Sequence, residues 1–404
     1  DGAFLAKGRF PEGRPSALVI TDHADQSSPD TIVALARGRS DAAQAIGGLL
    51  KHGLVITKSL FLRGDIDGEG RPQLEDTRVA AIAEEMAESG SEIGPHSVTP
   101  DPDERPVTEA GLLQFDHFHP STWIDHQPAT NCEAFTNQGW QGAGAPDAAR
   151  WRIADLLARH GYRYIWAGFD VPQLDLLNGS HLDRRPLSLW PVGRLAPGDP
   201  DDRWLFATTW MFVDRDEFFR TLSTTRIDQL ERDHGLTILH TYLESLHAGD
   251  DNPRFANRNV IRRVNGVVEL DPRFEKILED LRRRIDRGTL WMPTLKALGD
   301  FMRDVDRVRV RYAADGTALV VSPVAVRGMT FRVPGSVEVM VDGRPPAGRR
   351  EERGSTVFWF DLVAAHATRI AISPARDLDA VQAARAPSHF FARAREESSA
   401  TRVR

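Results

Sequence analysis

The chain has 404 residues, of which 41% are hydrophobic and 27% are charged, a composition typical of a folded globular protein. Its 58 aspartates and glutamates outnumber its 51 lysines and arginines, and the formal net charge of −7 argues against general nucleic-acid binding. No stretch approaches the roughly 20 apolar residues that a transmembrane helix needs, so we expect no transmembrane segment. The single cysteine, Cys132, cannot form an internal disulfide, and we interpret it as a packed loop residue.

Short apolar segments alternate with amphipathic segments from residue 17 to residue 304. The apolar segments predict strands at 17–21, 54–62, 92–94, 122–125, 162–167, 204–212, 236–240 and 290–292. The amphipathic segments predict a helix that begins near Ser28 and helices at 75–89, 107–116, 148–160, 215–233, 272–287 and 293–304. This alternation implies parallel strands with helices outside them. We therefore expect an α/β domain over residues 1–304, with a (β/α) barrel, complete or incomplete, favoured over an open sheet.

The pattern changes after residue 304. Short strands are predicted at 308–312, 318–322, 329–333, 337–341, 356–360 and 368–372. The pairs Asp315-Gly316 and Asp342-Gly343 favour hairpin turns. We expect a small C-terminal antiparallel β-sandwich domain over residues 305–375. Residues 376–404 are rich in Ala, Arg and Ser and predict a tail that is helical or disordered.

Acidic and imidazole side chains recur where predicted strands end. They occur at five strand ends: Asp22, His23 and Asp25; His96; Asp125 and His126; Asp170; and His240. In parallel β/α folds these ends converge on the face that carries the active site. One such residue could be a capping group placed by chance, but five together favour a site. Aspartate and neutral imidazole suit zinc or a similar divalent metal, which activates water and polarises a carbonyl.

The remaining histidines are interpreted as structural or solvent-exposed. His117 and His119 lie in a helix-to-strand connection, away from the strand ends. His52, His160 and His234 precede glycines at helix ends, where an imidazolium complements the helix dipole.

These motifs resemble those of the polysaccharide deacetylase superfamily (carbohydrate esterase family 4-like) over most of residues 15–300. The similar segments are TDHAD at 21–25, HSVTP at 96–100, DHQP at 125–128, residues 166–170, Leu239-His240 and GTLWMPT at 288–294. The resemblance implies a distorted (β/α)7-type barrel and a metal bound by one aspartate and two histidines. It also implies an aspartate base and a histidine acid, and the removal of acetyl groups from N-acetylated sugars.

The chain departs from the family pattern at two places. A histidine and an alanine separate Asp22 from Asp25, and Pro100 replaces the second histidine of the HSVTP motif. We expect His126 to stand in for the missing metal ligand, although it could equally contact substrate. The chain is therefore interpreted as a divergent member.

The resemblance also assigns roles. Asp22 matches the base, Asp25 the metal-binding carboxylate, His96 a metal ligand and His240 the general acid. His23 is either a ligand or a buried orienting group. Asp170 is expected to hold His240 in the correct tautomer as a supporting carboxylate.

The polar loop at 131–140 follows the third strand end and is a candidate for substrate contacts. Asn131, Trp140 and Tyr242 are the predicted substrate-binding residues, with core packing as the alternative for the two aromatic rings. The predicted function is a hydrolase that depends on a divalent metal, with zinc favoured, and that removes acetyl groups from a polysaccharide, with an N-acetylhexosamine polymer favoured. The resemblance implies an extracellular or periplasmic location. The alternatives are an amidohydrolase or esterase for a non-carbohydrate substrate, a glycoside hydrolase with paired carboxylates, and an inactive polysaccharide-binding protein.

Overall fold

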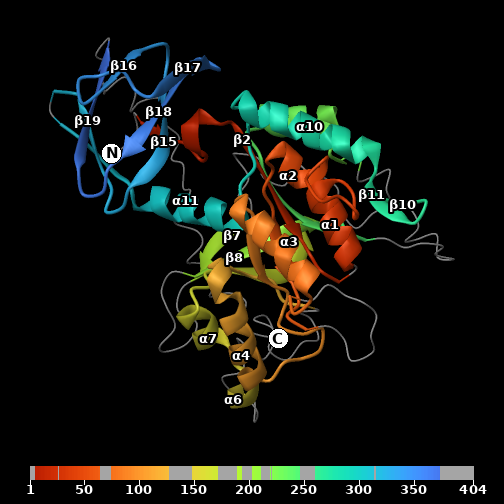
Figure 1. Ribbon diagram of the computed structural model, residues 1–404. Coiled ribbons are helices and arrows are strands. Elements are labelled where there is room, and N and C mark those ends of the chain that lie inside the picture. Colours follow the sequence, from red (N-terminus) through yellow and green to blue (C-terminus); the bar gives the residue numbers. More distant parts are fainter. Residues whose placement is uncertain are drawn as a thin grey trace. The chain divides into compact units, whose positions relative to one another are not determined.

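The computed structural model describes residues 5–25, 27–63, 74–126, 148–171, 189–192, 203–210, 219, 221–245, 260–313 and 315–373. The chain is a mixed α/β protein with several sheets (Figure 1). It divides into two compact units: Arg14–Arg303, and the described parts of Asp1–Gly13 and Asp304–Arg404. In the part of the chain that is described, no helix has both the length and the apolar character to cross a membrane.

The larger unit is organised around one nine-stranded sheet. Its strands are β2 (Ser16–Asp22), β3 (Thr57–Leu60), β4 (Glu92–Pro95), β5 (Thr122–Trp123), β6 (Tyr164–Val171), β7 (Leu189–Val192), β8 (Arg203–Trp210), β9 (Leu236–Thr241) and β12 (Leu290–Trp291). The sheet order is β4-β3-β2-β9-β8-β6-β5, and neighbours along this path are parallel. Strand β12 pairs with β2 in parallel and β7 pairs with β8 in antiparallel. An isolated parallel bridge between His96 and Ile124 joins the two ends of the path.

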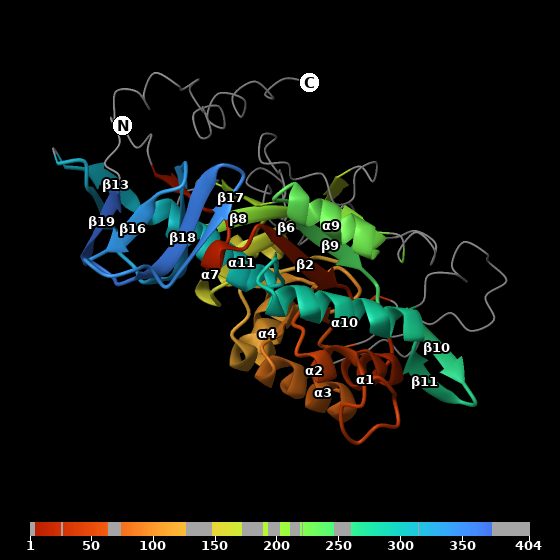
Figure 2. The same ribbon diagram turned by 90° about the horizontal axis from the view of Figure 1, so that it is seen from above.

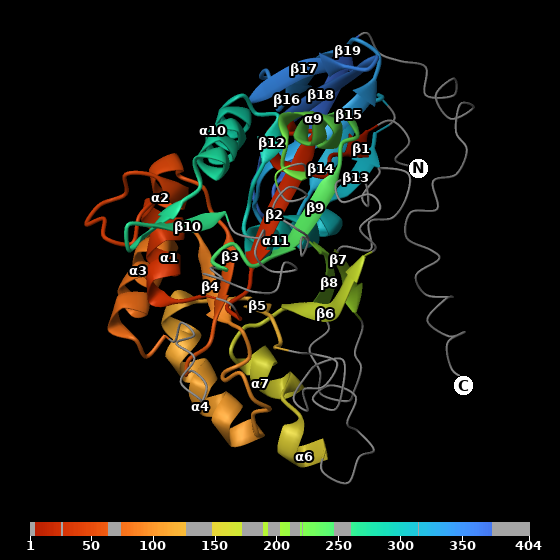
Figure 3. The same cartoon turned by 90° about the vertical axis from the view of Figure 1, so that its right-hand side faces the viewer.

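Helices flank this sheet, as the alternating sequence pattern predicts. They are α1 (Pro29–Arg37), α2 (Gly48–His52), α3 (Thr77–Glu88), α4 (Arg105–Phe115), α6 (Ala148–Trp151), α7 (Ala154–Arg159), α9 (Thr224–Arg232), α10 (Pro272–Asp286) and α11 (Leu295–Arg307), with the short 3-10 turn η2 (Asp116–Phe118). The other 3-10 turn, η1 (Pro11–Gly13), belongs to the smaller unit. The predicted helix start is confirmed, since Ser28 caps α1 and Pro29 occupies its first position. Figure 3 shows α1, α2 and α3 outside strands β2, β3 and β4.

Strand β2 lies at the centre of the core. All seven of its residues are buried. Leu18 and Ile20 belong to one apolar cluster with side chains of α1, α3 and α10. A strand covered on both faces is typical of parallel sheets, and burial of its apolar residues fixes its register against β3 and β9. The carboxyl end of β2 is therefore held between the first residues of β3 and the carboxyl end of β9.

Several boundaries differ from the sequence prediction. The predicted helix 148–160 is two helices, α6 and α7, and between them the carbonyl of Arg152 accepts a hydrogen bond from Arg105 (2.5 Å). The hairpin of β10 (Ile261–Val264) and β11 (Val267–Leu270), which packs beside α1 and α10 (Figure 2), was not predicted. For the predicted helix 215–233, residues 215–218 and 220 lie outside the described residues.

The smaller unit consists of two four-stranded antiparallel sheets. The predicted hairpin at Asp315-Gly316 joins β13 and β14, whereas Asp342-Gly343 forms a turn between β16 and β17, which lie in different sheets. The sheet orders are β1-β15-β18-β17 and β13-β14-β19-β16. The strands are β1 (Ala6–Lys7), β13 (Arg309–Tyr312), β14 (Ala318–Val321), β15 (Val326–Pro334), β16 (Glu338–Val341), β17 (Gly348–Glu352), β18 (Ser355–Leu362) and β19 (Ala367–Ser373). The assignment of residues 1–13 to the first domain is wrong for β1, because Ala6 and Lys7 pair with β15. The predicted tail 376–404 lies outside the described residues.

One buried carboxylate joins several elements at the start of the parallel strands. Glu92 Oε1 accepts hydrogen bonds from the amides of Ser121 and Thr122 (both 3.0 Å). Its Oε2 accepts from the Thr57 hydroxyl (3.2 Å) and from the Lys296 amide at the start of α11 (3.0 Å). Four donors from three segments thus depend on one side chain.

We expect Glu92→Gln to destabilise the protein by about 3 kcal/mol, because the amide turns an N–H group toward donors that need an acceptor. Chemical denaturation would measure this free energy. Glu88→Gln, an exposed change at the end of α3, is the matched control and should alter stability by no more than about 0.5 kcal/mol. Equal effects of the two variants would contradict the assigned role of Glu92.

Candidate metal centre

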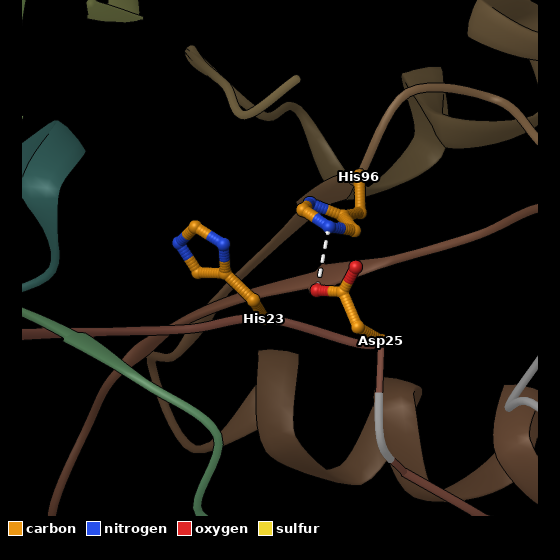
Figure 4. Close-up of side chains that lie close together, drawn as sticks. All are labelled: His23, Asp25 and His96. Carbon is orange, nitrogen blue, oxygen red and sulfur yellow. Dashed lines mark hydrogen bonds and ion pairs between the residues drawn. The ribbon is translucent and has the colours of Figure 1, made fainter. Parts of the chain in front are cut away.

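Imidazole and carboxylate side chains from separate strand ends meet at one point. His23 and Asp25 follow β2, and His96 follows β4. Each of these three residues offers one ligand atom, and the three atoms lie within 4.8 Å of one another. In Figure 4 the imidazole of His96 lies over the Asp25 carboxylate, and a ring nitrogen of His23 faces the same space. The predicted convergence of these distant residues is therefore observed.

The Asp25 carboxylate lies between two imidazoles. Its Oδ2 is 2.9 Å from His96 Nε2, and its Oδ1 is 2.8 Å from His126 Nε2. Burial raises the pKa of Asp25, but the two imidazoles outweigh burial and hold the pKa of this carboxyl well below its usual range. Asp25 is therefore ionised at neutral pH, and it brings one negative charge to the site.

The loop that follows β4 supports His126. The Pro100 carbonyl is 2.6 Å from His126 Nδ1, so this nitrogen carries the donated proton. Ser97 Oγ accepts from the His126 amide (2.9 Å) and donates to Asp125 Oδ1 (2.8 Å). A ring nitrogen bonded to a backbone carbonyl is the usual second contact of a metal-binding histidine. The backbone carbonyl of Pro100 thus orients the ring of His126.

His23 occupies a buried position beside His240. The two rings are stacked, with centroids 3.9 Å apart and planes inclined by 23°. Burial, together with the nearby His240 and His96, holds the pKa of His23 well below its usual value, and burial also lowers the pKa of His96. Among the described residues, the buried Nδ1 atoms of His23 and His96 have no hydrogen-bond partner. A neutral imidazole with an unbonded nitrogen is the form that binds a metal.

Aromatic rings surround the histidines. Phe61 contacts the rings of His96 and His126, with centroids 5.0 and 5.3 Å apart. Trp166 lies edge-on to His23 and to His240 (5.1 and 5.0 Å), and its Nε1 donates to Thr208. These rings restrict water around the imidazoles and lower the local dielectric, which strengthens electrostatic interactions there.

A lysine that the sequence analysis missed lies beneath the histidines. Lys58 is 1% exposed, and its Nζ is 2.7 Å from Asp22 Oδ2 and 2.9 Å from Glu244 Oε2. Burial lowers the pKa of Lys58, but the two carboxylates outweigh it and raise this pKa. A charged residue within the apolar run of residues 54–62 was the signal in the sequence that could have identified it.

Asp22, the predicted base, is fully buried in the same network. Besides Lys58, it accepts hydrogen bonds at Oδ1 from the Thr241 hydroxyl (2.9 Å) and the Leu243 amide (2.7 Å). The assignment of Asp22 as base stays a prediction. The network ties the end of β2 to the residues that follow β9.

The other predicted residues are placed as follows. The Tyr242 ring is 5.0 Å from His240 and 5.8 Å from His23, so it borders the cluster. Asp170 lies within β6, but its side chain is outside the described residues, as are Asn131, Trp140 and Cys132. His117 is exposed and bonds to Glu84, as expected of a residue away from the site.

The donor set suits a divalent first-row metal. It comprises neutral imidazole nitrogens, two of them without a hydrogen bond, and one ionised carboxylate oxygen. No protein-family model matches this chain, and no curated protein matches it either. Functional assignment therefore depends on the chemistry of these residues.

Glu244 provides a test of the buried network, because burial raises its pKa to about 7. The ordinary value is 4.5, so between these values the folded protein keeps a proton that the unfolded chain releases. This group thus lowers stability as pH rises through that interval. We expect the stability of Glu244→Gln relative to wild type to increase from pH 5 to pH 8 by up to about 3 kcal/mol.

Denaturation at several pH values would measure this difference. Lys58 remains paired with Asp22 in the variant, and Glu88→Gln again serves as the control. A difference that is constant or decreases with pH would contradict the raised pKa.

Proposed function

We propose that this protein is a metal-dependent hydrolase that removes acetyl groups from a polysaccharide, with an N-acetylhexosamine polymer as the favoured substrate. The observation that carries the proposal is the Asp25 carboxylate bonded to two imidazoles beside the unbonded Nδ1 of His23. The resemblance to polysaccharide deacetylases supplies the reaction. The parallel path and the His96–Ile124 bridge are consistent with a distorted (β/α)7-type barrel.

Asp25 and His96 are the residues that would hold the metal in either arrangement of ligands. The third ligand is His23, which completes the group within 4.8 Å, or His126, which contacts the other oxygen of Asp25. We favour zinc, because nitrogen ligands with one carboxylate and an open position are typical of catalytic zinc. A bound divalent metal lowers the pKa of a coordinated water and polarises the acetyl carbonyl.

Asp22 and His240 are assigned the proton transfers. Asp22 would accept a proton from the attacking water, and the Lys58 ammonium 2.7 Å away holds this carboxylate in place. His240 would donate a proton to the departing amine or alcohol. Its stacking on His23 places this acid directly beside the ligand cluster.

The surroundings of the histidines suit a sugar substrate. Tyr242 is only partly buried and borders His240, so its ring is available to pack against a pyranose. Trp166 is held by its bond to Thr208 and closes the other side of the stacked imidazoles.

Metal analysis tests the proposed centre. We expect one zinc ion per chain in wild-type protein, and we expect His96→Ala to lose it together with acetate release from N-acetylated polymers. EDTA should abolish the activity, and Zn²⁺ should restore it. His117→Ala removes an exposed histidine and is the matched control. Cleavage of glycosidic bonds that survives EDTA would instead favour a two-carboxylate glycoside hydrolase.

Two further variants separate chemistry from metal binding. Asp22→Asn and His240→Gln should keep the metal while kcat falls by about 10²–10⁴-fold, the usual contribution of a general base or acid. Acetate release and metal content measured on the same samples would show this. Full turnover by Asp22→Asn would overturn its role as base. A wild-type protein that binds polymer but holds no metal and releases no acetate would favour a binding protein.

A further inference from the structure

A buried set of three titratable groups joins the two segments that carry the stacked histidines. The carboxylates of Asp22 and Glu244 are fully buried, and the ammonium of Lys58 bonds to both. Asp22 immediately precedes His23, whereas Glu244 lies four residues after His240. Lys58 lies on the third strand, β3, which pairs with β2. The Lys58 side chain thus contacts both the segment that carries His23 and the segment that carries His240.

Backbone contacts extend this connection to the histidines. The amide of His23 donates to the Thr241 carbonyl (2.9 Å), which directly follows His240. The Thr241 hydroxyl and the Leu243 amide both donate to Asp22 Oδ1. Because Lys58 bonds to Oδ2 of Asp22, both oxygens of this carboxylate are hydrogen-bonded. The orientation of Asp22 and the separation of the two backbones are therefore set by the same contacts.

Burial of a lysine with two carboxyl groups is an expensive way to stabilise a fold, since apolar residues of similar size often serve as well or better. Because these three groups lie next to the segments that carry His23 and His240, we expect them to serve the site. We propose that Lys58 is a positioning residue that fixes the His23–His240 pair and Asp22 in the geometry the site requires. The proposal rests on the proposed function for its effect on turnover, but its effect on the imidazoles is independent of activity.

The chain contains a matched control for a buried cation. Arg284 is 2% exposed and forms ion pairs with Asp228, Glu231 and Asp280 (2.7, 3.0 and 2.8 Å). Glu231 accepts a bond from Thr289, whose carbonyl accepts from Ser16 at the opposite end of β2 from Asp22. Arg284→Met therefore removes a buried cation from three carboxylates away from the histidines.

The experiment compares Lys58→Met with Arg284→Met in the full chain. In metal-free protein, we expect Lys58→Met to shift or split the imidazole signals of His23 and His240 in ¹H–¹⁵N spectra. We expect Arg284→Met to leave the signals of both histidines in place. We expect Co²⁺ affinity to fall about tenfold or more, with a changed visible spectrum, only in Lys58→Met, as for other residues that orient metal ligands. In metal-saturated protein, kcat should fall at least tenfold with little change in KM.

The outcomes distinguish the two proposals. Wild-type protein without metal-dependent hydrolysis overturns the proposed function, while the imidazole spectra still test Lys58. If Lys58→Met leaves those spectra unchanged, or changes them no more than Arg284→Met does, the positioning role is overturned. Lys58→Arg, which retains the charge, should show smaller effects in the same direction. It replaces Lys58→Met if that variant does not fold.

Discussion

The requirement that buried charge be neutralised where the ends of β2 and β9 meet the start of β3 governs the structure of the site. Asp22 lies at the carboxyl end of a fully buried strand, and Lys58 on the adjacent strand supplies the opposite charge at 2.7 Å. Without that cation the carboxylate would carry a large desolvation cost. The ion pair therefore forms only in the register that places Asp22 beside Lys58. The register of β2 against β9 in turn determines where His23 and His240 meet.

A second charged group, the Asp25 carboxylate with its two imidazoles, lies in the loop that follows β2. Asp25 is ionised between His96 and His126, whereas burial favours the neutral forms of His23 and His96. Because Lys58 offsets Asp22, the carboxylate of Asp25 is the charge left to attract a cation to the imidazoles. This separation of an internally compensated layer from a cation-binding layer is the physical basis for the proposed metal chemistry.

Much of the candidate site followed from the sequence. Strand ends marked by aspartate and histidine predicted the meeting of His23, Asp25 and His96, because parallel strands end on a common edge. Lys58 and Glu244 were not anticipated, since a lysine in an apolar strand has no partner that sequence spacing can reveal. The pairing of Ala6–Lys7 with β15 was also missed, because a contact across more than 300 residues leaves no local pattern.

The sequence by itself determined the alternation of strands and helices, the change to antiparallel hairpins after residue 304 and the residue types that gather at the strand ends. These features depend on periodicity and turn chemistry, which are local. Only the tertiary structure decided that the Pro100 carbonyl supports His126, that Asp25 is shared by two imidazoles and that Lys58 binds two buried carboxylates. Those arrangements arise when packing brings distant segments within hydrogen-bond distance and burial makes every unpaired charge costly.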